Sequence, residues 1–228
     1  MAEVIDLIDL IRRTKRVYIC GNGGSAANAV HIANDLFAVG VRAHALTADI
    51  GILTATANDF DYAEIFSSQL HVYGEARDLL IALSGSGKSK NIYEALRAAK
   101  LNCGMLTCAI FGSYNHHDDI ASKCDMLIAR GRTMQEAEEE QIRIGHEVMI
   151  GLREGMIRPE QLTPNVVNAF FERSKIPAKC GFIKDRTIIL SINEQNNAAL
   201  EFTELWLKRT TGVPWSLQVQ PWKWPEPA

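Results

Sequence analysis

The stretch Cys20-Gly21-Asn22-Gly23-Gly24-Ser25-Ala26-Ala27-Asn28 decides the fold of this chain. Before it, residues 16–20 form a short, apolar, partly β-branched run that predicts a buried strand. After it, residues 26–37 carry apolar side chains at helical spacing. A strand, a glycine-rich turn and a helix in this order bring backbone N–H groups and the positive end of a helix to one point, where an anion or a polyol can bind. A glycine-rich turn by itself also serves simply to reverse the chain.

A second loop follows the most strand-like run of the sequence, residues 78–83. This loop, Ser84-Gly85-Ser86-Gly87-Lys88-Ser89, offers three hydroxyl groups before a helix expected at 91–100. Backbone and side-chain donors can therefore converge there on a phosphoryl group. The spacing of a nucleotide-binding Walker A loop is absent. The alternative interpretation is an ordinary helix cap followed by a flexible turn.

The order of the predicted elements indicates an α/β fold with a doubly wound, mostly parallel sheet. Strands predicted near 17–20, 42–46, 78–83, 104–110 and 125–129 alternate with helices, including one near 118–123 and a long one at 134–153. The pattern changes after residue 155, where prolines interrupt the chain. For this last part we expect a strand at 186–192, helices at 165–173 and 198–209, and an extended end at 215–228.

Composition restricts the classes of function. The chain has 228 residues, 47% of them hydrophobic, and a net charge of −3, which argues against a nucleic-acid or anionic-membrane surface. Five cysteines without a CxxC pair predict buried thiols in a reducing compartment. No signal peptide and no apolar run long enough to span a membrane is present, so we expect a soluble, cytoplasmic protein.

Four motifs, in order, resemble those of the sugar isomerase (SIS) domain family, and within it the sedoheptulose 7-phosphate (phosphoheptose) isomerases. They are the stretch 20–28 with His31, the segment 46–59, the loop 83–89, and the helix from Glu138 through His146. The resemblance covers residues 1–155, the expected phosphosugar-binding domain, whereas 156–228 forms an extension of unknown role. The resemblance implies a three-layer αβα sandwich and a homotetramer with active sites built at subunit boundaries.

The resemblance also implies roles for individual residues. The substrate phosphate would be held by Ser84, Ser86 and Ser89. The remaining substrate-binding residues would be Asn22, Gly23, Gly24, Ser25, Asp49, Asn58 and Glu138. Members of the family commonly bind Zn²⁺, and the matching ligands here are His31, Asp35, Glu138 and His146.

Two of these ligands depart from the family pattern. Asp35 replaces a glutamate, so its carboxylate reaches less far, and Glu138 replaces a glutamine, which adds a negative charge. Imidazole and carboxylate groups on two helices also make a sensible zinc site on chemical grounds alone. We expect His146 to act as base or proton shuttle and Asp35 as the partner acid. The alternative is that His31 is a core histidine and Glu138 part of a solvated acidic run.

Three functions are consistent with the sequence. The first is an aldose–ketose isomerase acting on sedoheptulose 7-phosphate through an enediol. The second is a non-catalytic phosphosugar-binding or adaptor protein of the same fold, and the third is another sugar-phosphate reaction. For the extension we expect subunit contacts, made by Trp206, Trp215, Trp222 and Trp224.

Overall fold

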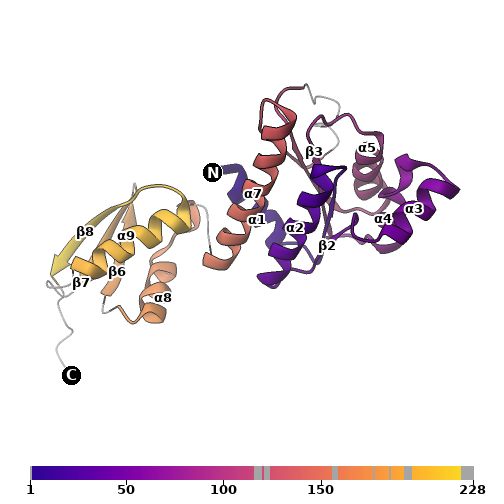
Figure 1. Cartoon of the computed structure of the whole chain (residues 1–228). Helices are drawn as coiled ribbons and strands as arrows, with labels where there is room; N and C mark the ends of the chain where they lie inside the picture. The colour runs from indigo at the N-terminus through magenta and orange to yellow at the C-terminus, as the bar shows by residue number, and fades with distance from the viewer. Residues whose placement is uncertain are drawn as a thin grey trace. The chain divides into compact units, whose positions relative to one another are not determined.

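The computed structural model describes residues 2–115, 120, 124–155, 159–176, 178–184, 186–192 and 197–221. The chain divides into two compact units, Ala2–Leu152 and Arg153–Ala228, called here the first and the second unit (Figure 1). Among the described helices, none is long and apolar enough to cross a membrane.

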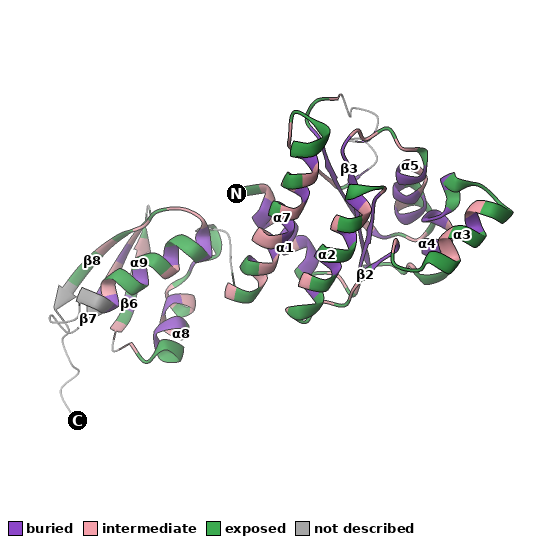
Figure 2. Ribbon diagram, in the orientation of Figure 1, coloured by how far each residue is buried: buried purple, intermediate pink, exposed green. Residues whose placement is uncertain are grey.

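The first unit is built on a parallel sheet in the order β2-β1-β3-β4-β5. Every residue of β1 and of β3 is buried, as expected for central strands covered on both faces. Figure 2 shows β3 in purple inside the unit. The strands are β1 (Val17–Cys20), β2 (Ala43–Ala45), β3 (Leu79–Ser84), β4 (Leu106–Phe111) and β5 (Met126–Ala129).

Helices cover both faces of this sheet, which confirms the predicted three-layer α/β architecture. In Figure 1, α1, α2 and α7 lie on one side of the sheet, and α3, α4 and α5 on the other. On the second side, apolar residues of α4 and α5 pack against Tyr18, Leu80 and Ala82 of the sheet. The helices of this unit are α1 (Ala2–Arg12), α2 (Gly24–Ala38), α3 (Ile50–Asp59), α4 (Ser67–Tyr73), α5 (Lys90–Arg97) and α7 (Met134–Glu154), with short helical turns at Tyr62–Glu64 and Ala98–Asn102.

The second unit has its own sheet and its own core. Its strands, in the order β6-β7-β8, pair antiparallel between β6 and β7 and parallel between β7 and β8. Within the core, the ring of Trp206 stacks on Phe170 at a centroid distance of 3.9 Å. The elements are α8 (Pro164–Ser174), β6 (Ala178–Lys184), β7 (Thr187–Ile192), α9 (Asn197–Thr211) and β8 (Ser216–Pro221).

Some sequence expectations differ from the structure or lie outside it. The sequence did not predict strand β6, and residues 216–221 of the expected extended end form strand β8 in the second sheet. The helix expected at 118–123 lies outside the described residues except for Ile120, as do Trp222 and Trp224. Four of the five cysteines are buried, but Cys103 is only partly so.

Candidate active site

The two glycine-containing loops lie side by side because they follow neighbouring parallel strands. The sheet order places β1 between β2 and β3, so the chain changes direction across the sheet at the β1–β3 boundary. This is the place where open α/β sheets bind their ligands. Asn22, after β1, and Asn91, in the first turn of α5, exchange amide hydrogen bonds of 2.9 and 2.8 Å. The Tyr62 hydroxyl donates to the same Asn22 oxygen at 3.2 Å.

The loop after β3 is shaped by hydrogen bonds between its own backbone and its serine side chains. The Ser84 hydroxyl accepts a hydrogen bond from the Gly87 N–H at 2.9 Å, and the Ser86 hydroxyl accepts one from the Lys88 N–H at 3.2 Å. Gly87 has a φ of 67°, a conformation that glycine adopts without strain. Ser89 precedes α5 without making a side-chain capping bond. The Ser89 hydroxyl and the positive N-terminal end of α5 therefore lie together where this loop ends.

Helix α2 begins at the loop after β1, and the carboxylate of Glu138 lies against its first turn. A Cβ atom built on Gly24 would come within 2.4 Å of the carboxyl carbon and of both oxygens of Glu138. Only glycine therefore allows Glu138 its position at this site. A carboxylate there is stabilised by the partial positive charge of the helix N-terminus.

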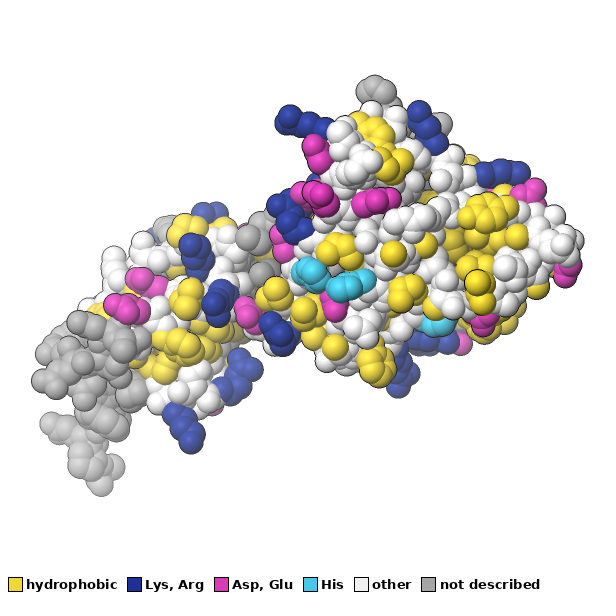
Figure 3. All heavy atoms as spheres, in the orientation of Figure 1, with side chains coloured by type: hydrophobic (Ala, Val, Ile, Leu, Met, Phe, Trp, Pro, Cys, Tyr) yellow, Lys and Arg dark blue, Asp and Glu magenta, His cyan; other side chains and the backbone are white. Residues whose placement is uncertain are grey.

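Further along the same two helices, three ionisable side chains converge. His31 and Asp35 lie one turn apart on α2, and His146 faces them from α7. The two Nε2 atoms lie 3.0 Å apart, and they lie 3.4 and 3.5 Å from Oδ2 of Asp35. The imidazole side chains are 51% and 45% exposed, so a ligand can reach them, whereas the Asp35 side chain is only 16% exposed. Figure 3 shows histidine side chains, drawn in cyan, next to one another on the visible face of the first unit.

This cluster has the donor set and the spacing that a zinc ion requires. Its ligand atoms all lie within 4.8 Å of one another. Two ligands of a tetrahedral zinc ion, each about 2.0–2.1 Å from the metal, are about 3.3 Å apart. The three separations in the structure are close to that value. In addition, Oδ2 of Asp35 is buried and accepts no hydrogen bond from any described residue, so a cation would satisfy it.

The structure brings together only part of the set that the sequence suggested. Of the four expected metal ligands, Glu138 lies outside the cluster, because its carboxylate points to Gly24. Asp49 caps α3 by accepting from the N–H of Ile52 at 3.0 Å. Asn58 donates to the neighbouring Asp59 at 2.7 Å.

The sequence reasoning missed the residues that tie the site together. Asn91 and Tyr62, which hold Asn22, and Asn28 and Gln141, which join α2 to α7, were not singled out. Each is an ordinary polar residue on a predicted helix or turn. Asn28 stands at the end of the glycine-rich stretch, but its contact with Gln141, like the contacts of the other three residues, is visible only in the folded chain.

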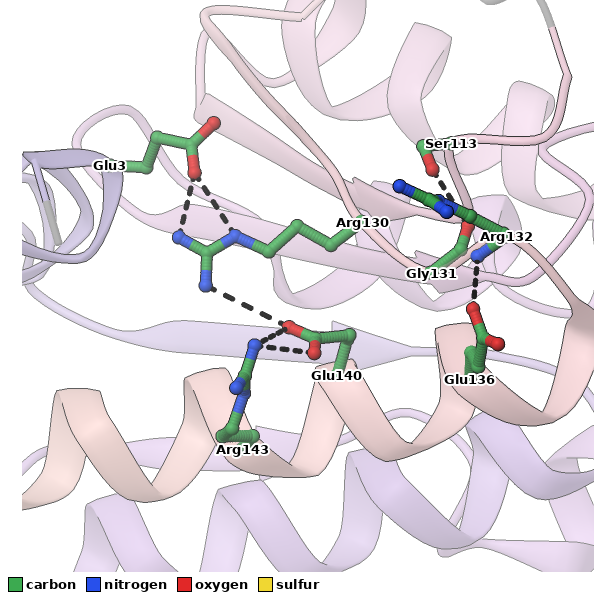
Figure 4. A network of polar contacts seen from close by, with 8 residues as sticks. All are labelled: Glu3, Ser113, Arg130, Gly131, Arg132, Glu136, Glu140 and Arg143. Carbon is green, nitrogen blue, oxygen red and sulfur yellow. Dashed lines mark hydrogen bonds and ion pairs between the residues drawn. The ribbon is translucent and has the colours of Figure 1, made fainter.

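Helix α7 is also fixed by a network of ion pairs at the end of β5 (Figure 4). Arg130 lies 2.7 Å from the carboxylate of Glu3 on α1 and 3.8 Å from that of Glu140 on α7. Glu140 also pairs with Arg143 on the same helix. These contacts connect the first helix of the unit to the helix that carries His146.

Comparisons with known protein families, sequences and structures all point to SIS-domain proteins. A family model of the SIS domain matches residues 2–112. The phosphoheptose isomerase of Burkholderia pseudomallei is 42% identical over 140 residues, which are 59% of this chain and 68% of that protein. That of Desulfovibrio desulfuricans is 40% identical over 124 residues, 52% of this chain and 58% of that protein. The solved phosphoheptose isomerase of Neisseria gonorrhoeae superposes with a TM-score of 0.62 at 30% identity, covering 67% of this chain and 86% of that one.

Proposed function

This chain belongs to the phosphoheptose isomerase family of SIS-domain proteins, and we propose that it interconverts sedoheptulose 7-phosphate and glycero-manno-heptose 7-phosphate. Such a reaction moves a proton between adjacent carbons through an enediol. It needs a base, an acid and a group that stabilises the developing negative charge. The observation that carries the proposal is that His31 and Asp35, on the helix that starts at the glycine-rich loop, converge with His146 of α7.

The loop after β3 is proposed to bind the phosphate. Ser84, Ser86 and Ser89 supply hydroxyl groups, and the positive end of α5 attracts the dianion. Asn22, Gly23, Gly24 and Ser25 would contact the sugar chain from the neighbouring loop. With a rise of 1.5 Å per residue, α2 carries His31 about 10 Å beyond Gly24, a reach comparable to the length of an extended heptose phosphate.

The proton transfers are proposed for His146 and Asp35. A histidine ring nitrogen with a free lone pair can take up and return a proton, and the His146 side chain is exposed to an incoming ketose. Asp35 lies 3.5 Å from it and would donate or accept the second proton. Because aspartate is one methylene shorter than glutamate, its reach toward the sugar depends on how closely α2 and α7 pack.

We further propose that His31, Asp35 and His146 hold Zn²⁺ in a second state of the site. In that state Nε2 of His146 would be a ligand of the ion, so His146 would act as a base only in the state without the ion. When bound, the ion would polarise the substrate carbonyl and lower the energy of the enediolate. These three side chains would supply three ligands, the number that catalytic zinc sites have. Glu138 of α7, whose carboxylate lies against the first turn of α2, is proposed to contact the substrate there and to contribute charge to the ion's surroundings.

Product analysis tests the proposal. Sedoheptulose 7-phosphate, with pentose and hexose phosphates as comparison substrates, is incubated with the full chain and followed by NMR. We expect an aldoheptose phosphate from the first substrate alone, and its loss when His146→Ala replaces the wild type. Conversion of none of these substrates would contradict the proposal and favour a non-catalytic binding protein. Undiminished turnover in His146→Ala would refute the role of that residue.

The second unit is proposed to contribute contacts between subunits of a homotetramer. Trp206 and Trp215 are engaged within their own unit, the first by stacking on Phe170 and the second by donating to the Thr211 hydroxyl at 2.7 Å. Phe202 and Leu205 on α9 are exposed by 52% and 46% and offer an apolar surface. Replacement of Phe202 and Leu205 by serine is expected to lower the mass measured by light scattering, and an unchanged mass would contradict this proposal.

A further inference from the structure

Helices α2 and α7 contact each other at successive helical turns, and at one of these turns the contact is made by polar side chains. There the Asn28 Nδ2 atom donates to the backbone oxygen of Glu138 at 2.9 Å and to Oε1 of Gln141 at 3.1 Å. One turn further along α2, Ile32 lies so close to Gly145 that a Cβ on the glycine would be 2.6 Å from Cγ1 of Ile32. Along α2, the polar contact of Asn28 is therefore followed, one turn later, by the close apolar contact between Ile32 and Gly145.

The bonds of Asn28 fix α7 in two ways at once. The bond to the Glu138 carbonyl holds a backbone atom of α7, whose position along the helix axis is thereby set. The bond to Gln141 holds a side chain that is fully buried and whose Nε2 has no partner among the described residues. Because the amide of Asn28 only donates here, it also decides which end of the Gln141 amide faces α2.

We propose that Asn28 is a positioning residue that sets the separation of His31 and His146. Asn28 is three residues from His31 on α2, and Gln141 is five residues from His146 on α7, so a sliding or rotation of either helix moves the imidazoles. A metal site tolerates ligand displacements of only about 0.2 Å. Partners that hydrogen-bond directly to a metal ligand change metal affinity about 10–100-fold when removed. Asn28 acts one step further away, by holding α7, so its removal should have an effect near the lower end of that range. The inference rests on the proposed metal site but does not depend on which sugar is converted.

The test compares Asn28→Ala with Asn34→Ala in the full chain. Asn34 lies on the same helix and is exposed, so its variant controls for the loss of an asparagine from α2. Affinity for Zn²⁺ alone is measured by competition with a chelating dye, and the visible spectrum of bound Co²⁺ reports the ligand geometry. We expect Asn28→Ala to lower the affinity about tenfold or more and to alter the cobalt spectrum. The Asn34→Ala values should equal those of the wild type.

Kinetics separate positioning from general loss of structure. In Asn28→Ala, kcat should fall by a larger factor than KM for the sugar phosphate rises, because the phosphate loop is untouched and only Glu138, among the substrate-binding residues, is held by Asn28. Gln141→Met keeps the bond from Asn28 to the Glu138 carbonyl and should give a smaller loss of metal affinity. This variant tests the inference even if Asn28→Ala does not fold. Equal zinc affinities and equal cobalt spectra in the wild type, in Gln141→Met and in any folded Asn28→Ala would overturn the inference. Metal binding that depends on Asn28 in a protein that converts no heptose phosphate would refute the proposed substrate and leave the inference standing.

Discussion

The Nε2 atoms of His31 and His146 lie 3.0 Å apart, although 115 residues separate the two histidines along the chain. Neither helix brings this about alone, since each histidine projects from its own helix toward the other. The close approach of α2 and α7 creates the pair, and it depends on Gly145, against which Ile32 packs. The geometry of the candidate metal site is thus a property of one helix–helix contact.

Replacement of Gly24 by alanine is expected to displace the Glu138 carboxylate. The added Cβ would come within 2.4 Å of that group, but the group ends a flexible side chain and can turn away. We therefore expect a several-fold fall in kcat/KM with a melting temperature within a few degrees of the wild type. The control is a double-mutant cycle with Glu138→Ala, in which the Gly24→Ala change should add little. Full additivity would mean that Gly24 does not act through Glu138.

Substitution of Asp125 by asparagine is expected to destabilise the first unit. Asp125 Oδ2 accepts from the N–H and the hydroxyl of Thr107, both at 2.9 Å, and Lys100 lies 3.0 Å from its other oxygen. Burial raises the pKa of this carboxyl, but the bonds from Lys100 and Thr107 together outweigh burial and hold the pKa below its ordinary value. Because the side chain is 34% exposed, we expect a loss of only about 1 kcal/mol at pH 7.

The pH dependence of that loss follows from the lowered pKa. Stabilisation by Asp125 is complete above the carboxyl's unfolded pKa of about 3.9 and disappears as the pH falls through the lower pKa of the folded state. Urea unfolding of the wild type and of Asp125→Asn should therefore differ at pH 7 and converge in strong acid. A difference that stays constant from pH 7 down to acid would contradict the ion-pair explanation.

The cysteines are expected to differ in reactivity. Burial raises the pKa of the thiols of Cys20 and Cys108, so these side chains carry almost no thiolate in the folded protein. Burial also raises the pKa of Cys103, whose side chain is however partly exposed. With a thiol reagent at pH 8 and analysis by mass spectrometry, Cys103 should be modified before the other two. Rapid modification of Cys20 in the folded protein would show that β1 is not buried as described.

The fold of the first unit could be predicted from the sequence because its signals are local. Residues 17–20 and 79–83 are apolar or weakly polar throughout, which is typical of central parallel strands, and each is followed by a glycine-rich loop. Strand β6 escaped prediction because Lys179, Gly181 and Lys184 interrupt its apolar character. In an antiparallel pair with one solvated face such residues are tolerated, but they weaken the sequence signal.

The candidate site could be predicted only in part, because some of its contacts form between segments that are distant in the sequence. The spacing of His31 and Asp35 follows from helix geometry, and His146 came from the resemblance. The direction of Glu138 could not be foreseen, because it depends on the rotation of α7 against the first turn of α2. The pairs Asn22–Asn91 and Asn28–Gln141 likewise exist only once distant segments have packed together.

The most direct measurement is anomalous scattering at the zinc edge from crystals of the full chain grown with Zn²⁺. The predicted result is a peak bonded to Nε2 of His31, Nε2 of His146 and the carboxylate of Asp35. Data with no peak at these three side chains, from a protein that still isomerises sedoheptulose 7-phosphate, would contradict the claim that this cluster is the metal centre of the enzyme.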